Sequence, residues 1–252
     1  MISKAHISQI RLLHHKKHRD AQGLFIVEGV KSCMEVLHSN LEVAESYLLS
    51  RGSERGLEVG DHWINISEKE MSKISCLTSP SEMLCIVKKP KYDLNCLERD
   101  KPLLVLDAIR DPGNLGTIIR TADWFGFSEI LCSEDCVEFT NPKVIQSSMG
   151  SFTRVKVVYA DLVSFLETER DRTVYGLFTK GEPIGKQLFK KNDIVILGSE
   201  SHGISEPLFS FLNNRIEIPV FLHQAGIPES LNAAVAAGIF MYEYRIHSSR
   251  CC

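Results

Sequence analysis

Polar side chains follow an apolar run at one point in the second half of the chain. The run LLVLDAI (103–109) stops at RDPGN (110–114), and a helical pattern with Arg120 on its polar face begins there. A guanidinium on such a helix could anchor a phosphate or stabilise negative charge on a reacting oxygen. The same pattern suits an ordinary surface arginine on an amphipathic helix, so the spacing leaves both interpretations open.

A second stretch, IVILGSESHGIS (194–205), places glycines on both sides of a glutamate after another apolar run. Glycines let the backbone turn sharply and approach a ligand closely. Glu200 could accept hydrogen bonds from a ligand, or it could cap a helix that begins near Ser205. His202 could form an acid–base pair with Glu200, although adjacent side chains usually point apart.

A third stretch begins where a strand ends at Pro219 and continues through a loop to a helix start at Ser230-Leu231-Asn232. Serine and asparagine favour helix capping, which is the simplest explanation for both residues. The run AAVAAG (233–238) has little side-chain bulk, so it permits close packing within the fold or against a second subunit.

The elements that must position these residues alternate between strands and helices. In the second half, strand-like runs lie at 103–109, 129–133, 153–160, 173–179, 193–199 and 215–220. Helical patterns lie at 114–125, 141–149, 161–170, 205–213 and 230–245. This alternation predicts an α/β fold with a parallel sheet, and such sheets bind ligands beyond the carboxyl ends of their strands.

The first half has the pattern of a smaller α/β arrangement, because helical patterns separate its strand-like runs. Those runs lie at 25–29, 45–50, 62–67 and 83–89. A charged, proline-containing stretch from KKPKYD (88–93) to ERDKP (98–102) is typical of a linker. We therefore expect a first domain at 1–92, a linker at 93–102 and a second domain at 103–252.

The composition is that of a globular protein, with 252 residues, 44% hydrophobic and 24% charged. We expect no membrane span, since the apolar stretches are only strand-sized, and no signal peptide at the N-terminus. Eight irregularly spaced cysteines favour a reducing, cytoplasmic location over a disulfide framework. We expect no metal site, because the nearest candidate pairs (Cys132 with Cys136, and His14 with His18) are more simply explained as structural or solvated.

The net charge of −3 excludes a protein coated with positive charge for nucleic acid, but it leaves room for a local basic patch. The segment RLLHHKKHR (11–19) is such a patch, and it predicts either a solvated helix face or a helix that touches an RNA backbone. The candidate RNA contacts are Arg11, Lys16, Lys17, Arg19 and Arg110.

The three stretches together resemble the motifs of a known enzyme family. Asn114-x-Gly116-x-x-x-Arg120-Thr121-Ala122, Leu197-Gly198-Ser199-Glu200-x-x-Gly203, and Ile218-Pro219 with Glu229-Ser230-Leu231-Asn232 resemble, in order, the motifs of the SpoU/TrmH RNA 2′-O-ribose methyltransferases of the SPOUT class. The resemblance covers 103–245. FIVEG (25–29) and the segment from TSP (78–80) to Val87 resemble the family's L30e-like substrate-binding domain.

The resemblance implies a fold, a cofactor and an assembly. The second domain would be a parallel-sheet SPOUT domain with a deep trefoil knot, would bind S-adenosylmethionine and would form a homodimer. The implied cofactor contacts are Leu197, Gly198, Ser199, Gly203, Ile218, Pro219, Ser230 and Leu231. The implied catalytic residues are Arg120, Asn114, Glu200, Ser230 and Asn232. The implied substrate is RNA, with ribosomal RNA favoured and transfer RNA possible.

Some residues depart from the family pattern. Ala234 lacks a hydroxyl that is usual two positions after the asparagine, the loop 219–229 is longer than the common form, and Ser201-His202 replaces a glycine and a basic residue.

A non-catalytic RNA-binding protein with a degenerate methyltransferase domain is one alternative function. A nucleotide-dependent oxidoreductase is disfavoured, because the glycine spacing after the first strand is wrong for that class.

Overall fold

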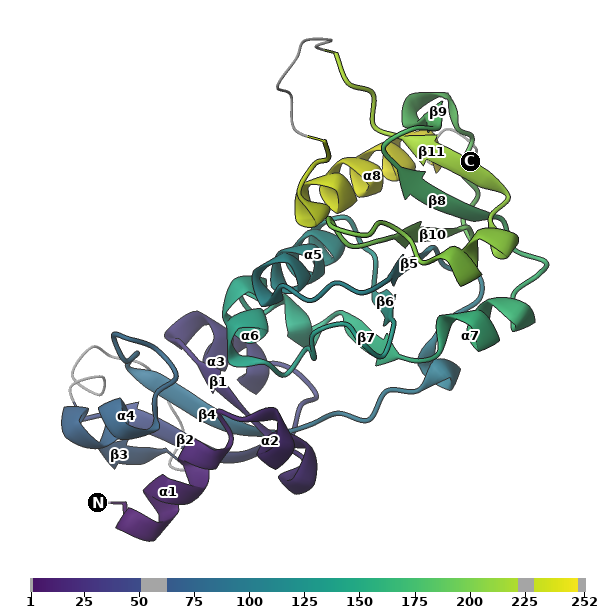
Figure 1. Ribbon diagram of the computed structural model, residues 1–252. Coiled ribbons are helices and arrows are strands. Elements are labelled where there is room, and N and C mark those ends of the chain that lie inside the picture. Colours follow the sequence, from purple (N-terminus) through teal and green to yellow (C-terminus); the bar gives the residue numbers. More distant parts are fainter. Residues whose placement is uncertain (1, 51–62, 222–228, 249–252) are drawn as a thin grey trace. The chain divides into compact units, whose positions relative to one another are not determined.

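The computed structural model describes residues 2–50, 63–221 and 229–248 (Figure 1). The chain divides into two compact units, one made of Met1–Lys91 with Glu138–Thr153 and the other of Tyr92–Val137 with Arg154–Cys252. The segment Glu138–Thr153, which we expected in the second domain, therefore belongs to the first unit. Its aromatic rings explain the difference, since Phe139 and Phe152 pack edge-on against Phe25 at 6.1 and 6.2 Å between ring centroids.

The first unit contains a four-stranded sheet in the order β1-β4-β2-β3. Its strands are β1 (Leu24–Glu28), β2 (Val43–Leu49), β3 (Ile64–Ile66) and β4 (Met83–Lys88). Strand β4 is antiparallel to both β1 and β2, whereas β3 is parallel to β2. The four expected strands are thus present, although residue 62 of the expected run 62–67 lies outside the described residues.

Five α-helices of the first unit lie within its described residues. They are α1 (Lys4–Leu12), α2 (Lys16–Gln22), α3 (Val30–Leu37), α4 (Glu68–Ile74) and α6 (Pro142–Ser148). Helix α4 begins with a capping box, in which Ser67 accepts from the Glu70 amide and the Glu70 carboxylate accepts from the Ser67 amide. Apolar residues of α1 and α4 pack against the sheet in one core, with Ile10, Met71 and Ile86 buried.

The second unit contains a seven-stranded sheet in the order β7-β6-β5-β10-β8-β11-β9, and every neighbouring pair is parallel. Its strands are β5 (Leu103–Leu106), β6 (Glu129–Cys132), β7 (Lys156–Tyr159), β8 (Val174–Phe178), β9 (Glu182–Pro183), β10 (Ile194–Leu197) and β11 (Asn214–Glu217). The expected parallel α/β sheet is confirmed. All residues of β5, β6 and β10 are buried, which explains why β5 and β10 read as continuous apolar runs.

The helices of the second unit are α5 (Pro112–Trp124), α7 (Leu162–Thr168) and α8 (Ala233–Ser248). Helices α5 and α8 lie side by side (Figure 1). The expected helix at 205–213 is instead a 3₁₀ helix, Glu206–Phe211. Shorter 3₁₀ turns occupy Leu94–Cys96 and Ile184–Lys186 here, and Ser151–Thr153 in the first unit.

Within the described part of the chain, none of the helices combines the length and apolar character that crossing a bilayer requires. The same residues contain no group of three or more histidine, cysteine, aspartate or glutamate side chains placed to hold a metal ion. The six cysteines that the structure describes are free thiols.

Candidate active site

The strands of the second sheet bring the three polar stretches to one edge. Because β5, β10, β8 and β11 are neighbours and run parallel, their carboxyl ends lie together. The segments that follow β5, β10 and β11 are the three stretches singled out in the sequence. The site is therefore assembled at the position where parallel sheets bind ligands.

A hydrogen-bonded cluster joins one residue from each stretch. The Asn114 side-chain amide donates to Glu200 Oε1 at 2.5 Å, and the Asn232 amide donates to Asn114 Oδ1 at 2.8 Å. Asn232 Nδ2 also lies 3.4 Å from Glu200 Oε1, which accepts from the backbone amide of Ala233 at 3.1 Å. A carboxylate at the start of α8 is favourable there, because the first amides of a helix carry partial positive charge.

Local sequence explains the orientation of both asparagines. Asp111 caps α5 by accepting from the Asn114 backbone amide at 2.8 Å, and Pro112 occupies the first helical turn. Asn232 caps α8, since its Oδ1 accepts from the amides of Ala234 and Val235 at 3.0 and 3.3 Å. The capping role expected for Asn232 is thus present, together with a second role in the polar cluster.

The loop after β10 is a tight turn around Gly198 and Gly203. The Gly203 amide donates to Ser199 O at 2.8 Å, and the His202 amide donates to Ser199 Oγ at 3.3 Å. A Cβ on Gly198 would lie only 2.0 Å from the Gly203 carbonyl carbon, so only glycine allows this approach. His202 pairs with Ser201 at 2.9 Å instead of forming the acid–base pair with Glu200 that the sequence left open.

A cavity of about 800 Å³ opens beside this loop. Its described lining includes all eight residues that the family resemblance implied as cofactor contacts: Leu197, Gly198, Ser199, Gly203, Ile218, Pro219, Ser230 and Leu231. The walls are largely apolar with a few polar groups, as is usual for a cofactor site. Most of the long loop 219–229, namely 222–228, lies outside the described residues.

Sequence reasoning missed one wall of this cavity, at the carboxyl end of β8. Leu177, Phe178 and Thr179 line the cavity there, together with Phe209. A Cβ on Gly176 would lie 2.6 Å from the Phe178 ring, so the missing side chain of Gly176 makes room for that ring. The sequence signal was a glycine two positions before an aromatic residue in a strand, where both face the same side.

An arginine covers the two aromatic rings of this wall. The Arg215 guanidinium lies 5.0 Å from the Phe178 ring centroid and 4.9 Å from that of Phe209. The rings contact each other edge to face at 5.8 Å. Because the guanidinium makes a cation–π contact with both rings, it stabilises the observed orientation of Phe178 and Phe209 in the cavity wall.

Arg120 is exposed on α5, as its position on the polar face predicted. It shares this exposed side of the helix with Thr117 and with Trp124, which is 85% exposed. Within the described residues, no hydrogen bond or ion pair joins Arg120 to the cluster of Asn114, Glu200 and Asn232. The structure thus assembles three of the five expected catalytic side chains, while Ser230 lines the cavity and Arg120 stands apart from them.

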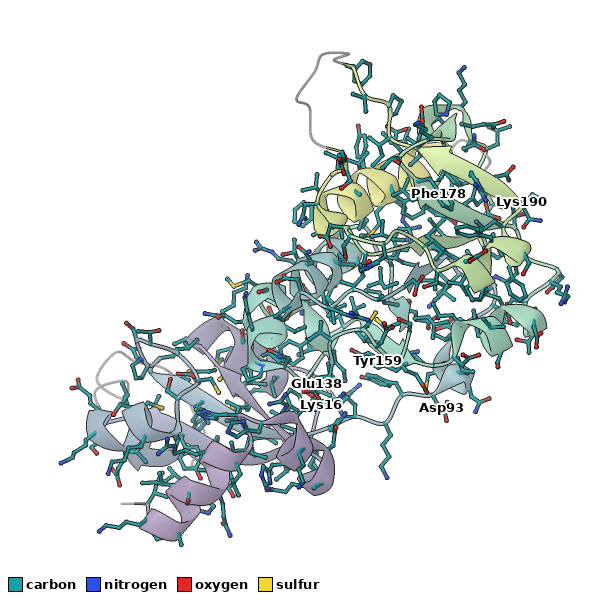
Figure 2. All side chains as sticks on the ribbon, viewed as in Figure 1. Lys16, Asp93, Glu138, Tyr159, Phe178 and Lys190 are labelled. Carbon is teal, nitrogen blue, oxygen red and sulfur yellow. The ribbon has the colours of Figure 1, made fainter. Side chains whose placement is uncertain are left out.

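The structure corrects one of the expected RNA contacts, Arg19. Its side chain is only 2% exposed, forms an ion pair with Glu138 and donates to the carbonyl oxygens of Leu13 and His14 at 2.8 Å each. This guanidinium stabilises the fold of the first unit and is not available to RNA. Arg11, Lys16 and Lys17 are exposed, and Lys16 is visible at the start of α2 (Figure 2).

Arg110 and His14 each have a partner within their own unit. Arg110 forms an exposed ion pair with Asp135 at 2.9 Å. A hydrogen bond from Ser133, aided by this guanidinium, lowers the pKa of Asp135 below its usual value. His14 Nε2 lies 3.0 Å from the carbonyl oxygen of Ile74, which supports a structural role for that ring.

Comparison with known proteins gives matches along almost the whole chain. The SpoU rRNA Methylase family matches residues 101–242, and the MRM3-like substrate binding domain matches residues 4–85. The 23S rRNA (guanosine(2553)-2′-O)-methyltransferase RlmP of Bacillus subtilis is 30% identical over 239 residues, which cover 92% of this chain and 93% of the relative.

Solved structures agree with these matches. A TrmH-family protein from Porphyromonas gingivalis has a TM-score of 0.85 at 30% identity, covering 98% of this chain and 100% of its own. The AdoMet-bound rRNA methyltransferase from Sinorhizobium meliloti has a TM-score of 0.85 at 26% identity, covering 98% and 96%.

Proposed function

Because the chain belongs to the SpoU rRNA Methylase family, we propose that it transfers a methyl group from S-adenosylmethionine to a ribose 2′-hydroxyl of ribosomal RNA. The observation that carries this proposal is the meeting of the three motifs at one edge of the sheet. There the cluster of Asn114, Glu200 and Asn232 adjoins a cavity lined by every implied cofactor contact.

The cavity suits the cofactor in size and in chemistry. S-adenosylmethionine, when bound, supplies an electrophilic methyl group on a sulfonium sulfur. Leu197, Ile218 and Leu231 offer apolar side chains and backbone groups around the cavity, and Gly198 leaves the backbone of the loop accessible. These residues would hold the cofactor, and its orientation would place the methyl group in line with the attacking oxygen.

Arg120 is our candidate for the residue that meets the RNA at the reacting ribose. Arginine stays protonated in nearly all protein settings, so its guanidinium would anchor a phosphate and stabilise the developing alkoxide. Glu200 would hold the start of α8 through Ala233, and Asn114 and Asn232 would keep its carboxylate in place. Ser230 would add a hydroxyl at the cavity wall.

We further infer a homodimer through the second unit, with helices α5 and α8 at the interface. Both helices carry large exposed apolar side chains, namely Trp124 at 85%, Val235 at 51% and Tyr242 at 51%. Arg120 shares the exposed side of α5 with Trp124, so a partner on this face would complete the site. Trp124→Glu should convert the dimer to a monomer in light scattering, whereas a protein that is monomeric without the substitution would refute the interface.

The trefoil knot and the domain roles are part of the same proposal. The knot is what the family resemblance implies for the second unit, in which β10 lies between β5 and β8. The first unit would hold the substrate, with Arg11, Lys16 and Lys17 as backbone contacts. Ribosomal RNA is favoured over transfer RNA by the names of the relatives, and a cytoplasmic location stays a prediction.

Methyl transfer from labelled S-adenosylmethionine to total RNA from cells that lack this gene tests the proposal. We expect label in alkali-resistant dinucleotides from ribosomal RNA, because a 2′-O-methyl group blocks alkaline cleavage. Label in small RNA would point to transfer RNA, and label in a base would overturn the reaction. If the chain neither labels RNA nor binds the cofactor, a non-catalytic RNA-binding protein would be favoured.

Arg120→Ala tests the assignment within the site. We expect transfer to be abolished while the affinity for S-adenosylmethionine stays nearly unchanged, because Arg120 does not line the described cavity. Arg170→Ala, another exposed arginine of the same unit, is the matched control and should keep its activity. Loss of cofactor binding in Arg120→Ala would refute the assignment.

A further inference from the structure

A buried aspartate connects both ends of the loop that follows β10, one through its backbone amide and the other through its carboxylate. Asp107, at the end of β5, is 4% exposed. Its backbone amide donates to Leu197 O at 2.9 Å, and its Oδ2 accepts from the Ser205 backbone amide at 2.6 Å. One residue therefore holds the loop 198–205 where it leaves the sheet and where it ends.

The chain around Asp107 adopts a conformation that needs support. The next residue, Ala108, has a φ of +56°, in the left-handed region that non-glycine residues rarely occupy. The Ala108 amide donates to Ser133 Oγ at 2.9 Å, and the Ile109 carbonyl accepts from the Val137 amide at 2.9 Å. These bonds maintain the strained turn that directly follows Asp107.

The loop between the two hydrogen bonds carries much of the candidate site. Gly198, Ser199, Gly203 and Ile204 line the cavity, and Glu200 binds the start of α8. The tight approach of Gly198 to Gly203 exists only while the loop stays closed. Asp107 itself does not line the cavity as the described residues define it, so any effect on a ligand must pass through the loop.

We propose that Asp107 is a positioning residue that holds the loop 198–205 in its cofactor-binding shape before the cofactor arrives. This inference rests on the proposed function, since it takes the cavity as the S-adenosylmethionine site. A loop ordered in advance loses less entropy on binding, so the hydrogen bond to Ser205 contributes to cofactor affinity without touching the cofactor.

Another buried aspartate of the same sheet provides a matched control. Asp193, at the opposite end of β10, is 1% exposed, and its Oδ2 accepts from the Lys190 amide at 2.6 Å. Its backbone carbonyl accepts from Leu103, so it also joins β5 to β10. Asp193→Ala should therefore destabilise the unit about as much as Asp107→Ala does, but at the edge away from the cavity.

Isothermal titration of the full chain with S-adenosylmethionine measures the effect. Asp107→Ala should weaken cofactor affinity about tenfold, because a charge-assisted hydrogen bond to the loop is lost. Asp107→Asn, which keeps an oxygen acceptor, should recover most of the affinity, and Asp193→Ala should bind like the unsubstituted chain. Hydrogen exchange without cofactor should be faster at residues 198–205 in Asp107→Ala only.

Ser205→Pro tests the same bond from the donor side if Asp107→Ala does not fold. The φ of Ser205 is −64°, which proline adopts, so the substitution removes the amide hydrogen without straining φ, and the proline ring displaces the Asp107 carboxylate. We expect the same weakening of cofactor affinity. Unchanged affinity in Asp107→Ala or in Ser205→Pro, or equal weakening in Asp193→Ala, would overturn the inference. An unsubstituted chain that does not bind S-adenosylmethionine would instead refute the proposed function.

Discussion

Replacing Gly198 with alanine should disable the cofactor site while leaving the rest of the second unit folded. The added Cβ would lie 2.0 Å from the Gly203 carbonyl carbon, 2.1 Å from its oxygen and 2.3 Å from the Ile204 nitrogen. All three are backbone atoms, so no side-chain rotation can relieve the clash. The loop itself must open.

The size of the opening follows from these distances. Ordinary van der Waals contact begins at 3.4 Å, so Gly203 must move away by the difference between 3.4 and 2.0 Å, about 1.4 Å. That displacement breaks the hydrogen bond from Gly203 to Ser199 and moves a wall of the cavity. Because a wall of the cavity moves, we expect cofactor affinity to fall. We expect methyl transfer to fall about a hundredfold, since a misplacement of about 1 Å can cost that much in rate.

Titration calorimetry with S-adenosylmethionine, beside a thermal melt, tests this expectation. Gly185→Ala is the matched control, because its Cβ would meet only the Glu243 carboxylate, at 3.9 Å, and it should bind normally. A folded Gly198→Ala chain that binds the cofactor as tightly as the unsubstituted chain would refute the steric reasoning. It would also show that the loop does not form the cofactor site in this shape.

Other perturbations test other parts of the molecule. Backbone and side-chain hydrogen bonds from Ser67 lower the pKa of Glu70 from 4.5 to about 2. The contribution of Glu70 to stability is therefore present above about pH 4.5 and is lost as the pH falls toward 2. In Glu70→Gln, the free energy of unfolding should depend less on pH in that window, and an unchanged pH dependence would contradict the assignment. Arg19→Met should lower the free energy of unfolding in urea by about 3–5 kcal/mol, because it leaves the Glu138 carboxylate buried without its partner. A decrease of less than about 1 kcal/mol would contradict the buried ion pair. Arg215→Ala should weaken cofactor affinity by about two- to fivefold through the cavity wall that it covers, whereas Arg170→Ala, whose cation–π contact lies elsewhere, should not.

The sequence by itself determined the class of the second unit and the members of its polar cluster. Alternating apolar runs and helical patterns predicted the parallel sheet, because buried strands and amphipathic helices impose different periods on the chain. The resemblance to the SpoU/TrmH motifs implied Asn114, Glu200 and Asn232, and each of them follows a strand of one sheet. Parallel strands necessarily bring their carboxyl ends together, so distant segments could be expected to meet.

Only the tertiary structure decided features that depend on which segments pack together. Arg19 reads as part of a basic patch, but its guanidinium is buried because Glu138, 119 residues away, lies against it. The segment 138–153 joins the first unit because its aromatic rings fit against Phe25, and no local pattern encodes that choice. The Asp107 carboxylate and the Phe178 wall were missed for the same reason. Local propensity specifies elements, whereas burial and long-range hydrogen bonds are set by partners that are remote in sequence.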